Sequence, residues 1–132
     1  MTVFVDSHVI LDLVNRDAVW LDWSRSMLEL HAAQGLLVNA MVYAELCGNA
    51  QSPDEVDTLL NALDAQVAEI SRQALFDAAK AHITYRRSGG TRTSGLPDVF
   101  IGAHAQALGI PLLSRDTARH ATYFPQVRLI CP

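Results

Sequence analysis

Four acidic residues lie where a folded chain could gather their carboxyl groups. Asp6 closes a short β-branched and aromatic run that is typical of a strand. Asp116 closely follows a later apolar run of the same kind, and Asp98 begins an apolar helical pattern. Glu45 lies about one turn into another expected helix. In an open α/β sheet, the carboxyl ends of the strands form the usual ligand site, so we expect these four acids to converge there.

Four carboxylates in one pocket need a cation. Two of them about 5 Å apart repel by about 3 kcal/mol at an effective dielectric of 20. Oxygen ligands in that number suit Mg²⁺ or Mn²⁺ rather than Zn²⁺. A hard cation held in this way can polarise a phosphodiester and activate an attacking water.

Each acid taken alone has an ordinary structural explanation. Asp6 and Asp116 could be turn formers or helix caps. Asp98 could be an acid in the first turn of a helix, where the helix dipole favours negative charge, and Glu45 could be a solvated surface residue. The prediction of a metal site therefore depends on the joint placement of all four.

The pattern of apolar residues alternates strands with helices along the whole chain. We expect strands at 2–5, 36–38, 67–70, 110–113 and 127–130. We expect helices between the first four of these strands, with Ser7, Asn39, Ser52 and Ser71 as N-caps. This order predicts an α/β protein, a three-layer α/β/α sandwich with a mostly parallel central sheet. At 132 residues without repeats or linkers, residues 1–132 are expected to form a single domain.

Composition sets limits on location and partners. The two cysteines, Cys47 and Cys131, form no metal-binding or disulfide pattern. No apolar run is long enough for a membrane span, and the first residues lack a signal-peptide pattern, so we expect a cytoplasmic protein. The net charge of −4 argues mildly against binding nucleic acid by charge alone. The four site acids account for that charge, leaving 10 acids against 10 basic residues.

Three segments resemble the motifs of PIN-domain nucleases. They are the opening Val3-Phe4-Val5-Asp6-Ser7-His8-Val9-Ile10-Leu11-Asp12, the central Val42-Tyr43-Ala44-Glu45-Leu46, and the later Leu96-Pro97-Asp98-Val99-Phe100-Ile101-Gly102-Ala103-His104-Ala105. Gly109 to Asp116 follows in the same order, and the match is most specific over 96–116. The size and the ending, from Tyr123 to Pro132, resemble VapC toxins of bacterial toxin–antitoxin pairs.

The resemblance implies a Mg²⁺- or Mn²⁺-dependent endoribonuclease that cuts structured RNA such as tRNA or rRNA. It also implies a homodimer, for which the helices within 52–87 are our candidates, and inhibition by a VapB-like antitoxin. Matched by motif, Asp6 and Asp98 would be the principal metal ligands, and Glu45 and Asp116 would complete the site or orient water. Ser114 matches a Ser or Thr position and could bond to a carboxylate or water.

Several other residues allow more than one interpretation. Arg86, Arg87, Arg92, Arg115 and Arg119 could grip RNA phosphates or be ordinary surface charge. The five histidines show no ligand spacing, so we expect packing or solvent roles for them, and we read Asp12 as peripheral. The stripe formed by Trp20, Trp23, Met27 and Leu30 is expected to join the core or to line a groove for an antitoxin segment.

Two rival functions stay open. An aspartyl phosphotransferase also places an Asp after its first strand, but needs a second Asp two residues later, where this chain has His8. A non-catalytic interaction module on a PIN fold is the other alternative, against which the intact acidic set argues. Metal-dependent cleavage of RNA would separate both from a nuclease.

Overall fold

A five-stranded parallel sheet forms the centre of the molecule. The computed structural model describes residues 2–87 and 95–132. The strands are β1 (Val3–Val5), β2 (Leu36–Asn39), β3 (Ala65–Ala68), β4 (Leu112–Leu113) and β5 (Leu129–Ile130). Their order across the sheet is β3-β2-β1-β4-β5, and each neighbouring pair is parallel. The predicted fold class is confirmed.

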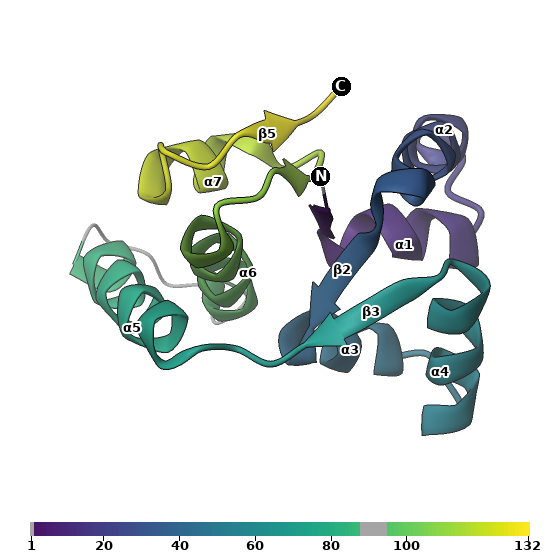
Figure 1. Cartoon of the computed structure of the whole chain (residues 1–132), viewed down its shortest axis with the longest axis horizontal. Helices are drawn as coiled ribbons and strands as arrows, with labels where there is room; N and C mark the ends of the chain where they lie inside the picture. The colour runs from purple at the N-terminus through teal and green to yellow at the C-terminus, as the bar shows by residue number, and fades with distance from the viewer. Residues whose placement is uncertain (1, 88–94) are drawn as a thin grey trace.

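Helices cover both faces of this sheet (Figure 1). One face carries the helices that connect β1 to β2 and β2 to β3: α1 (Ser7–Val14), α2 (Leu21–His31), α3 (Ala40–Cys47) and α4 (Pro53–Ala62). The other face carries the later helices: α5 (Arg72–Arg87), α6 (Gly95–Leu108) and α7 (Thr117–Tyr123). A short 3₁₀ turn, Ala32–Gln34, extends α2, and Gly35 with φ of 94° then turns the chain into β2.

Capping explains where several helices begin. Asn39 and Ser52 cap α3 and α4 as predicted, because their side chains accept hydrogen bonds from backbone N–H groups one turn ahead. The prediction was wrong for α1, where Asp6 rather than Ser7 occupies the cap and Ser7 is the first helical residue. The same carboxyl group that we expect to bind metal therefore also starts a helix.

The main core lies between the sheet and α1, α3 and α6. Its innermost side chains have 0% exposure and include those of Phe4, Ile10, Ile101, Leu112 and Leu113. Gly102 lets the end of α7 approach α6, since a Cβ there would lie 2.3 Å from the ring of Phe124. Strands β1 and β4 at the centre of the sheet, at whose ends Asp6 and Asp116 lie, are thus completely buried.

The largest differences from expectation are in three strands and one helix. The third strand begins at Ala65 rather than Val67, and β4 and β5 are only the last two residues of their predicted ranges. Helix α7 was not predicted at all, and it carries residues of the site.

The Trp20 stripe does not form core as a whole. Leu30 is 64% exposed, and Trp20, Trp23 and Met27 are half-buried, while Leu28 is the apolar residue of α2 that is fully buried. Within the described ranges, none of the helices has both the length and the apolar character needed to cross a membrane.

Candidate metal centre

The site lies at the carboxyl ends of β1 and β4, where the strand order changes direction. From β1 the chain proceeds outward through β2 and β3, and β4 and β5 then occupy the other side of β1. The backbone N–H of Asp6 donates to the carbonyl of Leu113 at 3.0 Å, which ties the two strand ends together. This is the position at which open parallel sheets bind ligands.

Asp6 is buried and fully engaged, with 1% exposure. Its Oδ1 accepts from the backbone N–H of Ser7 at 2.8 Å, and its Oδ2 accepts from Ser114 Oγ at 2.7 Å and from His120 Nε2 at 3.1 Å. Burial alone would raise the pKa of Asp6, but the His120 hydrogen bond, the charges of His8 and His120, and Ser114 lower it below its ordinary value. Asp6 is therefore held as a carboxylate.

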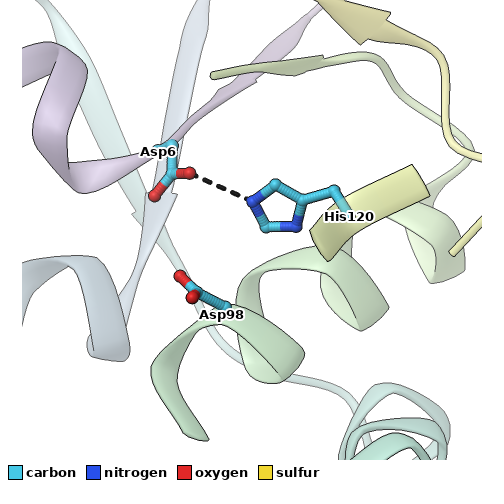
Figure 2. Close-up of side chains that lie close together, drawn as sticks. All are labelled: Asp6, Asp98 and His120. Atoms are coloured by element: carbon cyan, nitrogen blue, oxygen red, sulfur yellow. Dashed lines mark hydrogen bonds and ion pairs between the residues drawn. The ribbon is translucent and has the colours of Figure 1, made fainter. Parts of the chain in front are cut away.

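Asp98 faces Asp6 from the first turn of α6. Ligand atoms of Asp6, Asp98 and His120 all lie within 4.8 Å of one another, and Figure 2 shows the three side chains pointing toward a common point. Burial and the charge of Asp6 raise the pKa of Asp98, although an ion pair with Arg119 opposes the rise. The carboxyl pair thus carries negative charge that its neighbours only partly neutralise.

Glu45 is at the edge of this group rather than inside it. Its side chain is exposed overall, yet its Oε1 accepts from Ser7 Oγ at 2.9 Å. Loss of solvation at the carboxyl group raises the pKa of Glu45, and the charges of Asp6 and Asp98 raise it further. The carboxyl group of Glu45 therefore interacts electrostatically with both acids. Its ligand atoms nevertheless lie outside the group that Asp6, Asp98 and His120 form within 4.8 Å.

Asp116 also stays outside that group. It is the N-cap residue of α7 without a side-chain cap bond, and its backbone N–H donates to Ser114 Oγ at 3.1 Å. Its charge contributes to the raised pKa values of His120 and Arg119, so its carboxyl group is close to the site. The structure thus gathers Asp6 and Asp98 closely and leaves Glu45 and Asp116 around them.

His120 is the site residue that the sequence analysis missed. We expected no histidine at the metal site, but His120 is 1% exposed and contacts Asp6 directly. Burial would lower the pKa of His120, whereas the hydrogen bond and the charge of Asp6 raise it above its ordinary value. His120 lies on α7, which the sequence pattern did not predict, so no signal in the sequence pointed to it.

The arginines around the site separate into different environments. Arg115 makes two hydrogen bonds to the buried Asp12, whereas Arg119 pairs with Asp98. Arg86 and Arg87 are exposed at the end of α5, and Arg92 lies outside the described residues. Asp12 is peripheral to the metal site, as we expected.

His104 packs in the core. Its Nδ1 accepts from the amide of Asn39 at 3.2 Å, and its ring meets Phe4 edge to face with 5.3 Å between centroids.

The donors at the site fit a divalent cation. Two nearby carboxylates and an imidazole nitrogen are ordinary ligands for such an ion. Burial raises the pKa values of Asp98 and Glu45, and the charges of neighbouring carboxylates, which a cation would offset, raise them further. Two carboxylates and an imidazole at the switch point of a doubly wound parallel sheet define an α/β/α protein with a candidate site for a divalent cation.

This chain belongs to the PIN domain family, whose model matches residues 3–125. Among curated protein sequences, none matches this chain significantly.

Solved structures share the fold. VapBC2 from Rickettsia felis bound to a promoter DNA fragment is 17% identical with a TM-score of 0.71, covering 99% of this chain and 98% of that chain. DNA-bound VapBC from Salmonella typhimurium is 15% identical with a TM-score of 0.70, at the same coverages. A toxin–antitoxin complex from Klebsiella pneumoniae is 20% identical with a TM-score of 0.68, covering 98% of this chain and 97% of that chain.

Proposed function

We propose that this chain is a divalent-metal-dependent endoribonuclease in which Asp6, Glu45, Asp98 and Asp116 form the metal site. The observation that carries the proposal is the approach of Asp6 and Asp98 at the switch point of a PIN-domain sheet. Mg²⁺ or Mn²⁺ would supply Lewis-acid polarisation of the phosphodiester. In this proposal residues 1–132 act as one nuclease domain.

The residues around the ion have distinct tasks. Asp6 is kept ionised by its donors, so it offers a permanent negative charge to a cation. Ser114 and the backbone N–H of Ser7 fix the orientation of that carboxylate. Glu45, with its raised pKa and its partly exposed position, is placed to accept a proton from an attacking water.

Arg119 is the arginine best placed to contact the RNA backbone. It pairs with Asp98 and is 23% exposed, so its guanidinium lies at the rim of the site. A cation that neutralises Asp98 would weaken this ion pair and leave Arg119 to donate to a phosphate. Arg115 is committed to Asp12 and has no such freedom.

We further propose that the nuclease is the toxin of a toxin–antitoxin pair, held inactive by a VapB-like antitoxin. The structural neighbours are toxin–antitoxin complexes with nearly full mutual coverage, which supports this assignment. An Arg from the partner could enter the acidic site and relieve the repulsion between its carboxylates. The chain offers an apolar hollow between α1, α3 and α4, lined in part by Leu11, Leu46, Val56 and Leu59.

A homodimer through the 52–87 region is also part of the proposal. Helix α5 exposes Leu75, Phe76 and Ile83 to between 42% and 58%, which is unusual for large apolar side chains grouped on one helix. Light scattering on the purified chain should give twice the chain mass. A monomer at tens of micromolar would contradict the dimer.

RNA cleavage by the partner-free chain tests the nuclease itself. Purified chain should cut RNA with Mg²⁺ or Mn²⁺, stop with EDTA, and stop again when its antitoxin is added back. Asp98→Asn should retain the circular dichroism spectrum and lose at least about 100-fold in rate, because a ligand charge is gone. The matched control is Asp22→Asn, an exposed acid on α2.

Full activity of Asp98→Asn, or activity in EDTA, would contradict the four-acid site. If the wild-type chain binds its antitoxin yet cleaves no RNA with any divalent metal, the non-catalytic module becomes the better description.

A further inference from the structure

The side chain of His120 lies where a metal ligand should lie. Its Nε2 is 3.1 Å from Asp6 Oδ2, and both atoms lie within 4.8 Å of a ligand atom of Asp98. Two ligands about 2.1 Å from one octahedral ion and at right angles to each other are about 3 Å apart. The observed separation therefore suits two neighbouring ligands of one ion.

The lone pairs of Asp6 Oδ2 point to the same conclusion. One of them accepts from Ser114 Oγ at 2.7 Å, and the other accepts from His120. A carboxylate oxygen has two lone pairs, so a cation that binds Oδ2 must displace one of these two donors, and displacing His120 uncovers the lone pair of its Nε2. The Nε2 lone pair uncovered in this way faces the same ion.

The rest of the imidazole allows this exchange. His120 is 1% exposed, and its Nδ1 has no hydrogen-bond partner among the residues that the structure describes. Asp6 Oδ2 holds a ring proton on Nε2. A cation bound to Oδ2 would take the place of that proton, so that Nδ1 could carry the ring proton instead. The Nε2 proton moves to solvent or to Nδ1, and the ring stays a neutral ligand.

We propose that His120 is a nitrogen ligand of the metal, together with Asp6 and Asp98, and that this ligand makes the site select Mn²⁺ over Mg²⁺. An imidazole binds transition-metal ions better than Mg²⁺, which prefers oxygen. The proposal rests on the proposed function, since it names a further ligand of the same ion.

His8 is the competing nitrogen. Its Nε2 lies 3.4 Å from Asp6 Oδ2 and 3.3 Å from Ser114 Oγ, and its side chain is 26% exposed. It does not belong to the group of described residues whose ligand atoms lie within 4.8 Å of one another. His8→Gln is therefore the matched control for His120→Gln.

Pulsed electron paramagnetic resonance of the Mn²⁺-loaded chain tests the assignment directly, because a coordinated imidazole imposes ¹⁴N modulation on the Mn²⁺ signal. Modulation should be present in the wild type and in His8→Gln and absent in His120→Gln. Labelling the wild type with ¹⁵N-histidine should replace the ¹⁴N modulation by a ¹⁵N pattern. This experiment needs no variant, so it remains possible if His120→Gln fails to fold. Titration calorimetry should show Mn²⁺ binding about tenfold or more tightly than Mg²⁺, and a smaller ratio in His120→Gln.

The outcomes separate this inference from the proposed function. Bound Mn²⁺ without ¹⁴N modulation, or modulation lost in His8→Gln but kept in His120→Gln, would overturn the His120 ligand and leave the acidic site standing. Failure of the chain to bind Mn²⁺ or Mg²⁺ at all would overturn both.

Discussion

Two arginine–aspartate pairs lie close together beside the site, and they are built differently. Arg115 holds Asp12 through Nε and Nη2 at 2.9 and 2.8 Å, and its guanidinium lies 5.3 Å from the centre of the Trp20 ring. Arg119 meets one oxygen of Asp98 and lies 5.8 Å from the centre of the Tyr85 ring. The side chain of Asp12 is 3% exposed, and that of Asp98 is 14% exposed.

The difference between the pairs indicates different roles. Ser24 adds a third hydrogen bond to Asp12, so both carboxylate oxygens are engaged within the fold. The pKa of Asp12 is raised by burial but lowered more by the Arg115 and Ser24 bonds, and it ends below its ordinary value. The pKa of Asp98 ends above its ordinary value. Arg115 engages both oxygens of Asp12, whereas Arg119 engages one oxygen of Asp98 at the candidate metal site.

The largest effect should come from breaking the Arg115–Asp12 pair. Asp12→Asn removes the charged carboxylate to which Arg115 and Ser24 donate hydrogen bonds, so that the guanidinium faces a neutral amide. We expect a loss of about 2 kcal/mol in the free energy of unfolding, less than a fully buried pair because the Arg115 side chain is 26% exposed. Urea unfolding followed by circular dichroism measures it.

The control for Asp12→Asn is Asp22→Asn, which removes the exposed Arg25 pair and should cost less than about 0.5 kcal/mol. Because the pKa of Asp12 is lowered in the fold, its stabilisation is complete above its ordinary value of 3.8 and is lost as the pH falls below it. The difference between wild type and Asp12→Asn should therefore be constant above about pH 5 and narrow below about pH 4. A difference that stays constant to lower pH would assign the effect to packing instead of charge.

A smaller effect, on activity, should come from the other pair. Arg119→Gln should lower the single-turnover rate of RNA cleavage in saturating Mn²⁺ about tenfold, the value of one charged hydrogen bond to a phosphate. Its stability in Mn²⁺ should change by less than about 1 kcal/mol, since the cation replaces the charge beside Asp98. Arg128→Gln, an exposed arginine just before β5 and away from the site, is the control. An unchanged rate in Arg119→Gln would show that the two pairs do not differ in function.

The sequence predicted those parts of the site that depend on strand ends. Val3, Phe4 and Val5 are a buried β-branched and aromatic run, so the place where β1 ends at Asp6 could be read directly. Asp98 could be placed at the start of α6 for a similar reason, because an apolar helical pattern follows it. These two acids are also the ones that the structure brings closest together.

Short elements without a strong pattern could not be predicted. Helix α7 has seven residues, mostly polar or small, and it is held in place by Phe124 against Gly102 rather than by an apolar stripe of its own. Such packing is tertiary and leaves little periodic signal. Because this helix was missed, His120 was missed as well. Ser7 and Asp6 are equally good N-caps by residue type, and only the backbone geometry distinguishes them.

The sequence distances within the site have a consequence for synthesis of the chain. Asp6 meets Ser114 and His120 across 108 and 114 positions. A ribosome adding about 5–20 residues per second needs roughly 6–23 s to pass from the first of these residues to the last. During that interval the growing chain carries Asp6 without the two side chains that hold it in place. If the proposed function is right, the nuclease site cannot assemble on a chain that is still shorter than 120 residues, and such a chain cannot cleave the RNA of the ribosome that makes it.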